Sequence, residues 1–241
     1  MPTQIDESQL KNHPTVSAGD WYAAGANLLV KEKALTKMRD EVAALRRGLP
    51  WTPVKEDYLF HGPNGAVKLS ELFDGKSQLL VYHAMWGPNS DSPCPGCSFV
   101  MDHIDAARLH FEHHDTAFAA VSRAPLGRFA GFKERMGWAF RWLSSDGTTF
   151  NYDFGVSFRR EDLDSGEVFY NFKPQKLRGE DQPGLTAFYK NEDGEIFRTY
   201  STYERGLDIL LGAYNFIDLT AKGRNEKHTM DWVEIHDQYQ D

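Results

Sequence analysis

The stretch Gly87–Phe99, GPNSDSPCPGCSF, holds both cysteines of the chain, two residues apart and framed by prolines. Before it, residues 76–83 form a short apolar run after an Asp-Gly turn, which predicts a buried strand. After it, residues 97–114 carry apolar side chains at helical spacing, and TAFAAVS at 116–122 predicts a second strand. The pattern is a βαβ unit with the cysteines at the carboxyl end of its first strand, where open α/β sheets place their sites.

The prolines predict the local geometry of the two cysteines, Cys94 and Cys97. A residue that precedes proline is pushed out of the helical region, so Cys94 should be extended and should cap the helix. Pro95 then takes the first helical position, where no N–H is needed. The helix dipole and the free N–H groups lower the pKa of a thiol at this place from ~8.5 into the range ~3.5–7.5. We therefore expect Cys94 to be an attacking thiolate and Cys97, one turn inside the helix, to be the resolving thiol.

Composition excludes several classes of function. The chain has 241 residues, 41% of them hydrophobic, which is enough to bury a sizeable core. Its net charge of −8 argues against nucleic-acid and anionic-membrane partners, because both require clustered Lys and Arg. The first ten residues are polar and no run of 18 apolar residues occurs, so we expect a cytoplasmic protein. A structural disulfide is not expected there, and one between such close cysteines would constrain the chain little.

Longer segments resemble a known family. CPGC after LLVYHAMWG, followed by a long helix, resembles the C-x-x-C active site of the thioredoxin superfamily. FHGPNGAVKLSELFDGKSQLLVYH, NYDFGVSF and GLTAFYKNEDGEIFRTYSTYERGLDILLGAYNFIDLT together resemble an uncharacterised bacterial family of thioredoxin-like proteins with a domain of unknown function. That family is related to the alkyl hydroperoxide reductase and thiol-specific antioxidant group. The resemblance runs from about Val30 to Glu226.

The resemblance implies an α/β thioredoxin-like fold, in which helices flank a central mixed sheet. We expect an N-terminal helical extension over residues 1–50, a thioredoxin-like domain over 51–222 and a C-terminal tail over 223–241. An insertion at about 155–183, before the last hairpin, is expected to act as a lid or an interface. Patterning predicts further elements: helices at 34–49, 127–137 and 203–216, a hairpin at 58–69, a strand with alternating aromatic residues at 138–142, and a hairpin at 185–200.

The resemblance leaves three functions open. The first is a thiol-disulfide oxidoreductase that needs no cofactor and acts on a disulfide-containing protein or a small thiol. The second is a peroxiredoxin-like thiol peroxidase, whose P-x-x-x-[ST]-x-x-C loop is matched by Pro88 and Ser92 although Cys94 comes one residue early. Arg123 or Arg128 would supply the cation that such a peroxidase uses. The third is a non-catalytic thioredoxin-like binding module, and a homo-oligomer is compatible with all three.

Four further residues are candidates for the substrate groove or for tuning the thiols. Thioredoxins have a proline that faces the cysteine pair; here Pro183 falls about one residue early and Gly184 lies nearest that place. His83 ends the first strand and would act either as a nearby base or as a hydrogen-bonded structural histidine. Trp86 would line the groove or pack in the core. Arg205, in TYSTYERG, would approach the cysteine loop or form a helix-terminal ion pair.

Zinc is the rival interpretation of the cysteine pair. Cys94, Cys97, His103 and His110 supply four ligands of the right type. The two histidines, however, are seven residues apart and therefore about 10 Å apart along a helix, whereas zinc bonds are ~2 Å long. We therefore expect no metal site.

Overall fold

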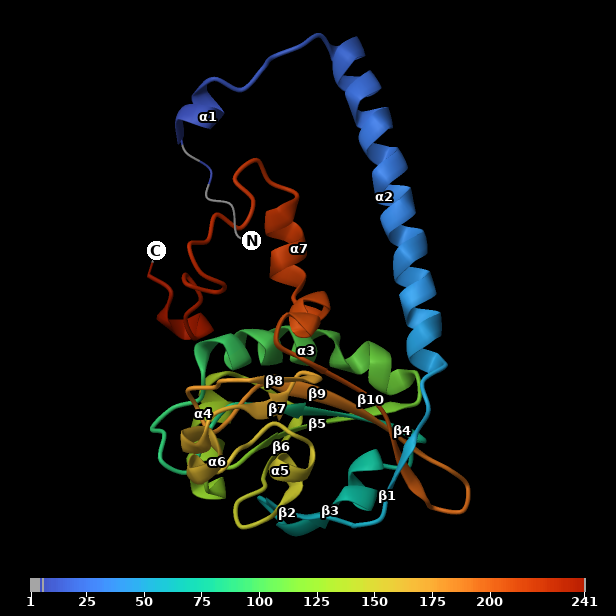
Figure 1. Ribbon diagram of the computed structural model, residues 1–241, viewed down its shortest axis with the longest axis vertical. Helices are drawn as coiled ribbons and strands as arrows, with labels where there is room; N and C mark the ends of the chain where they lie inside the picture. The colour runs from blue at the N-terminus through green and yellow to red at the C-terminus, as the bar shows by residue number, and fades with distance from the viewer. Residues whose placement is uncertain (1–4, 6, 241) are drawn as a thin grey trace. The chain divides into compact units, whose positions relative to one another are not determined.

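The structure is a computed structural model that describes residue 5 and residues 7–240 (Figure 1). The chain divides into two compact units. One unit consists of Met1–Pro50 and Phe216–Thr229, and the other of Trp51–Asn215 and Met230–Asp241. Within the described residues, no helix is both long enough and apolar enough to cross a bilayer.

The first unit contains the short helix α1 (Glu7–Lys11) and the long helix α2 (Ala18–Arg47). Ser17 caps α2 by accepting a hydrogen bond from the backbone N–H of Asp20, and the helix ends at Gly48. The helix predicted at 34–49 therefore starts much earlier than expected. Its first half escaped prediction because apolar residues there surround the helix and leave no single polar face.

The second unit is built on an eight-stranded mixed sheet with the order β1-β10-β9-β4-β5-β6-β2-β3. The strands of this sheet are β1 (Thr52–Val54), β2 (Leu59–Gly62), β3 (Gly65–Lys68), β4 (Gln78–His83), β5 (Thr116–Ser122), β6 (Arg141–Ser144), β9 (Gly184–Lys190) and β10 (Ile196–Tyr203). A separate hairpin pairs β7 (Val168–Tyr170) with β8 (Lys173–Gln175). Strands β4 and β5 are parallel, with Gln78 opposite Thr116, and β9 runs antiparallel to β4.

Helices cover both faces of this sheet (Figure 1). The helices of the second unit are η1 (Leu69–Phe73), α3 (Pro95–His113), η2 (Leu126–Arg128), α4 (Phe129–Arg135), α5 (Phe150–Asp153), α6 (Arg160–Ser165), η3 (Glu204–Leu210) and η4 (His236–Gln238). Helix α7 (Gly212–Asp218) starts in this unit and ends in the first. Two apolar clusters fill the faces, because alternate residues of β4 and β5 point to opposite sides: Tyr82 belongs to the α3 cluster, Val81 to the cluster with η1 and α5.

The order β10-β9-β4-β5, with α3 joining the two parallel strands, is the arrangement of a thioredoxin-like fold and confirms the predicted fold class. Some predicted boundaries are wrong. The helix after the cysteines begins at Pro95, the first helical position that the prolines predict, two residues before its apolar periodicity starts, whereas the aromatic strand is limited to Arg141–Ser144. The predicted closing helix consists of η3 and α7, separated at Leu211. The insertion contains α6, β7 and β8 around a small apolar cluster of its own.

Candidate functional site

The cysteine pair lies at the start of α3. Cys94 is the N-cap, with extended backbone angles of φ −63° and ψ 130°, and Pro95 occupies the first helical turn as expected. The Cys94 carbonyl accepts the first helical hydrogen bond from Ser98 N–H at 3.0 Å. The Cys94 N–H in turn donates to the Met85 carbonyl at 3.1 Å. This bond fixes the N-cap residue to the start of the loop that follows β4. Both cysteines are free thiols, Cys94 half-buried and Cys97 buried.

Cys97 is enclosed by the loop and by the neighbouring strand. The Met85 N–H donates to the Cys97 sulfur at 3.3 Å. Tyr82, from β4, places its buried hydroxyl beside the same sulfur. That hydroxyl has no aligned hydrogen-bond partner among the described residues, so the Cys97 thiol is its polar neighbour.

The two thiols have opposite acidities. A hydrogen bond from the Cys97 thiol, helped by the backbone N–H groups of Cys97 and Gly96 and opposed by partial burial, lowers the pKa of Cys94 to about 6. The same hydrogen bond and complete burial hold the pKa of the Cys97 thiol well above its usual range. At neutral pH the pair is therefore one thiolate stabilised by one thiol.

Cys94 opens onto a cleft of about 650 Å³. One side of the cleft is the loop before α3, which includes Ser92, and the other side comes from the insertion. The polar side chains of the cleft wall include Asn89, Ser90, Ser92, Arg123, Arg160, Glu180 and Asp181. The insertion therefore forms part of the surroundings of Cys94.

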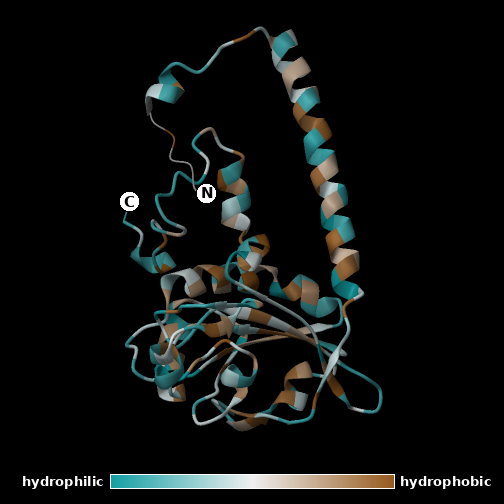
Figure 2. Ribbon diagram, viewed as in Figure 1, coloured by the Kyte–Doolittle hydropathy of each residue, from teal (hydrophilic) through white to brown (hydrophobic). Residues whose placement is uncertain are grey.

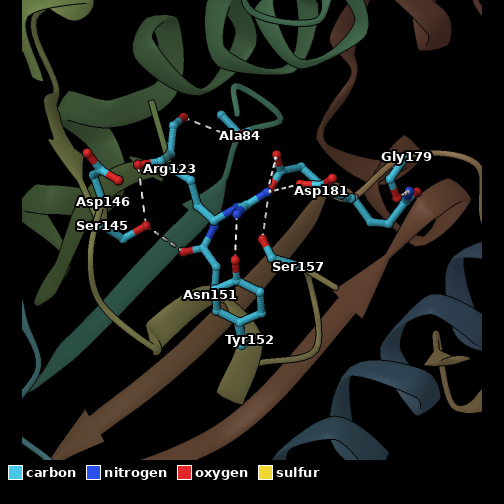
Figure 3. Close-up of polar contacts among 12 residues, drawn as sticks. Ala84, Arg123, Ser145, Asp146, Asn151, Tyr152, Ser157, Gly179 and Asp181 are labelled. Carbon is cyan, nitrogen blue, oxygen red and sulfur yellow. Dashed lines mark hydrogen bonds and ion pairs between the residues drawn. The ribbon is translucent and has the colours of Figure 1, made fainter. Parts of the chain in front are cut away.

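Arg123, directly after β5, ties the insertion to the core (Figure 3). Its guanidinium donates to both carboxylate oxygens of Asp181, with Nε–Oδ1 at 2.6 Å and Nη2–Oδ2 at 3.1 Å. It also donates to Glu180 at 3.2 Å and to the Tyr152 hydroxyl. Ser157 donates a further hydrogen bond to Asp181 at 2.7 Å. The side chains of Arg123 and Asp181 are mostly buried, so this bidentate pair fixes one wall of the cleft.

A glycine allows this wall to approach the cysteine loop. A Cβ added at Gly87 would lie 2.6 Å from Asp181 Oδ2, well inside van der Waals contact. The residue after Trp86 must therefore lack a side chain if the insertion is to close on the loop.

His83 and Trp86 do not take part in the cleft. His83 points to the opposite face of the sheet, where its Nε2 bonds to Thr186 Oγ1 at 3.0 Å and its ring stacks on Phe150. Burial, reinforced by the charge of Arg198, lowers the pKa of His83 to about 3, so the ring is neutral. Trp86 packs in the core and donates its indole N–H to Ser90 at 2.9 Å. Both side chains therefore make structural contacts away from the cleft.

Of the other candidate residues, two line the cleft and three do not. Ser92 and Arg123 line the cleft, whereas Arg128 is exposed and donates to the Ser90 carbonyl, which braces the loop from outside. Gly184 begins β9 opposite His83 and is buried under Tyr203. Arg205 pairs with Asp208 at 2.9 Å within η3 and does not line the cleft.

His103 is used for packing. Its Nδ1 contacts the Phe99 carbonyl at 2.7 Å, and its Nε2 accepts from Ala213 N–H at 2.9 Å. Both ring nitrogens are thus occupied by the backbone, and the residue connects α3 to α7. No group of three or more metal-ligating side chains gathers anywhere in the part of the chain that the structure describes.

Sequence reasoning missed Tyr82, Tyr152, Glu180 and Asp181. Strand alternation places Tyr82 and its neighbour His83 on opposite faces of the sheet, but it does not show which of them faces α3. Asp181 lies in an irregular segment, and nothing local in the sequence indicates its approach to Arg123.

The fold and the cysteine pair at the start of α3 define a thioredoxin-like α/β protein. The chain belongs to the family described as "Bacterial protein of unknown function (DUF899)", whose model matches residues 10–239. This confirms the resemblance that the sequence suggested. No curated protein has a significantly similar sequence.

Several solved structures are similar to part of the chain. Peroxidoxin BcpB from Mycobacterium tuberculosis has a TM-score of 0.45 and 16% identity over 69% of this chain and 96% of its own. Xanthomonas campestris peroxiredoxin Q has a TM-score of 0.43 and 17% identity over 67% and 96%. A secreted M. tuberculosis disulfide oxidoreductase homologous to E. coli DsbE has a TM-score of 0.37 and 15% identity over 65% and 92%. At these TM-scores the likeness says nothing of what this chain does.

Proposed function

We propose that the protein is a thiol-disulfide oxidoreductase that uses Cys94 as nucleophile and Cys97 as resolving thiol. The observation that carries this proposal is the unequal pair at the start of α3. Cys94 is accessible from the cleft with a pKa of about 6, while Cys97 beside it is buried and protonated. A structural pair of thiols has no need of this difference, whereas thiol exchange depends on a thiolate with access to its substrate.

The reaction proceeds in two exchanges. The Cys94 thiolate attacks one sulfur of the substrate disulfide, forms a mixed disulfide and expels the other substrate sulfur as a thiolate. The Cys97 thiol then gives up its proton to the expelled thiolate or to water and attacks Cys94 Sγ. This step forms the Cys94–Cys97 disulfide and releases the second substrate thiol. The substrate gains two electrons, which an external dithiol must return to the protein.

Conversion of Cys94 to a disulfide partner removes the negative charge that Cys97 stabilises. Once the mixed disulfide forms, the Cys97 proton no longer bonds to a thiolate, so the cause that most raises the pKa of Cys97 disappears. The resolving thiol therefore becomes easier to ionise after the first exchange. The change in the pKa of Cys97 therefore agrees with the proposed order of the two exchanges, in which Cys94 attacks first and Cys97 attacks second.

The cleft favours small disulfides or an exposed disulfide loop of a protein. Its volume of about 650 Å³ lies in the range of ~300–1,000 Å³ that is typical of sites for small molecules. We place this activity in the cytoplasm, where a reduced thiol pair is maintained and can act as the electron donor.

Two serine variants test the proposal. With bis(2-hydroxyethyl) disulfide as substrate and dithiothreitol as reductant, Cys94→Ser should lose the protein-dependent rate, because the attacking thiolate is gone. Cys97→Ser should accumulate a mixed disulfide at Cys94, visible as added mass of one substrate half. Full activity in Cys94→Ser would overturn the proposal.

A peroxidase is the second candidate, because Arg123 lines the same cleft as Cys94. There the Cys94 thiolate would attack the O–O bond, take one oxygen as sulfenic acid and release an alcohol or water. The two functions differ in the Cys97→Ser variant. Rapid oxidation of Cys94 to sulfenic acid by peroxide, without reaction with the disulfide, would favour the peroxidase. Resistance of both cysteines to peroxide, disulfide and alkylation would favour the binding module.

A further inference from the structure

Helix α2 carries a seven-residue repeat of apolar side chains. Trp21, Leu28, Leu35 and Val42 are spaced by seven residues, and a second series begins three residues later. These are positions a and d of a heptad repeat. We call them the seam, which consists of Trp21, Ala24, Leu28, Lys31, Leu35, Met38, Val42 and Leu45. Lys31 is its single charged member.

Most of the seam is open. Five of its large apolar side chains are exposed by fractions from 52% for Leu35 to 72% for Leu45, and Val42 is half-buried. Among the described residues, none that belongs to α2 is buried. Figure 2 shows apolar residues recurring along this helix. A helix of 30 residues that buries nothing lacks the packing from which most helices in proteins gain their stability.

We propose that α2 pairs with α2 of a second copy of this chain in a parallel two-stranded coiled coil. A heptad seam is self-complementary, because each a and d side chain fits between side chains of an identical helix. The seam spans four heptads, and α2 is about 45 Å long at 1.5 Å per residue. The a, d, e and g positions of four heptads supply about 16 contacting residues per partner.

The flanking charges favour the parallel orientation. In a parallel pair, Glu41 at position g of one helix faces Arg46 at position e of the second copy, which is an attractive contact. In an antiparallel pair in full register, Glu32 would face Glu32 of the second copy. In the parallel form, Lys31 lies beside Glu32 of the second copy, which carries the opposite charge. The long side chain of Lys31 can also extend out of the seam, so that its ammonium group stays in solvent.

A pair of adjacent residues provides a matched test. Leu28 is in the seam, whereas Leu29 is at position b and outside it, and both are exposed. Leu28→Lys should raise the dissociation constant of the dimer at least about 100-fold, because it places two charges in the apolar seam. Leu29→Lys should leave the constant within about threefold of that of the unchanged chain. Sedimentation at micromolar concentrations measures the dissociation constants of the unchanged full chain and of the two variants. Circular dichroism compares the helix content of the three proteins.

Cross-linking tests the geometry even if a lysine variant fails to fold. In a Cys94→Ser, Cys97→Ser background, Val42→Cys at position a should form an intermolecular disulfide on mild oxidation, because the two a positions of a parallel pair face each other. Ala43→Cys at position b should not. The proposal is overturned if the unchanged chain is monomeric, if Leu28→Lys and Leu29→Lys dimerise alike, or if the two cysteine variants cross-link equally. None of these measurements depends on the thiol chemistry proposed above.

Discussion

At the scale of single residues, the chemistry of the pair follows from where each sulfur sits on α3. Cys94 is the cap, and the backbone N–H groups of the first turn help to lower its pKa, whereas Cys97 is inside that turn and buried. The buried Tyr82 hydroxyl acts in the opposite direction to burial, because its position beside the Cys97 sulfur lowers the pKa of Cys97. Under the proposed function, Tyr82 is therefore a positioning residue for Cys97.

Tyr82→Phe should slow resolution of the mixed disulfide, because the pKa of Cys97 rises further without the hydroxyl. The change in unfolding free energy should stay within about 1 kcal/mol, since the hydroxyl lacks an aligned nitrogen or oxygen partner. Rapid-quench mass spectrometry of the mixed disulfide measures the rate. Tyr58→Phe is the control: its hydroxyl bonds to Asp153 at 2.9 Å on the other face of the sheet, so it should lower stability and leave resolution unchanged. Equal resolution rates in Tyr82→Phe and the unchanged chain would contradict this role.

The position of Cys94 at the start of the helix was predictable from the sequence, and the position of Tyr82 beside Cys97 was not, for a physical reason. Pro95 acts on the residue directly before it, so the extended cap at Cys94 follows from local sterics. His83 and Tyr82 are adjacent, and only the register of β4 in the sheet decides which of them faces α3. That decision depends on packing with residues far away in the sequence.

At the scale of elements, the buried pair of Arg123 and Asp181 ties the insertion to the core. Arg123→Ala should destabilise the protein by about 3–5 kcal/mol, because it leaves the carboxylate of Asp181 buried without its partner. Arg128→Ala, which removes one exposed hydrogen bond to Ser90, should cost less than about 1 kcal/mol. Urea unfolding measures both. Arg123→Ala should also raise KM for the disulfide more than it lowers kcat, and unchanged stability would show that the pair does not hold the insertion.

Gly184 tests the packing between β9 and the insertion. A Cβ at this position would meet Val156 at 2.9 Å and Tyr203 at 3.0 Å, so Gly184→Ala should cost about 1–3 kcal/mol from overpacking. Gly127→Ala meets nothing within 4 Å and should be close to neutral. Thermal unfolding of the two variants compares them directly. A neutral Gly184→Ala would mean that β9 and Val156 separate easily.

Regular elements with one apolar face were predictable, and the insertion was not. β4, α3 and β5 follow from apolar patterns of periods 2 and 3.6, and the β9–β10 hairpin follows from its Asn-Glu-Asp-Gly turn. Arg123 and Arg128 were both candidates for the cation near the thiol, and nothing in the sequence selected either of them. Asp181 selects Arg123, through a pairing across 58 residues of chain that no local pattern encodes.

At the scale of the whole molecule, the reduced thiolate links stability to pH. The folded pKa of Cys94, about 6, is lower than that of a thiol in an unfolded chain, so the thiolate stabilises the fold. This contribution is fully present above the unfolded value of ~8.5 and is lost as pH falls through about 6. The stability difference between the reduced protein and Cys94→Ser should therefore grow from pH 6 to pH 8.5. Urea titrations across this range measure it, and a difference independent of pH would contradict the ionisation assigned to Cys94.

The most direct test of the central claim is the pH dependence of iodoacetamide labelling of the reduced protein, with each labelled cysteine identified by mass spectrometry. Only thiolates react, so the labelling rate at Cys94 should rise with pH to half its plateau near pH 6, as its lowered pKa requires. Cys97 should remain unlabelled in the native protein through neutral pH, because it is buried and protonated. Equal labelling of the two cysteines, or a midpoint for Cys94 near that of an ordinary thiol at ~8.5, would contradict the assignment of Cys94 as the attacking thiolate.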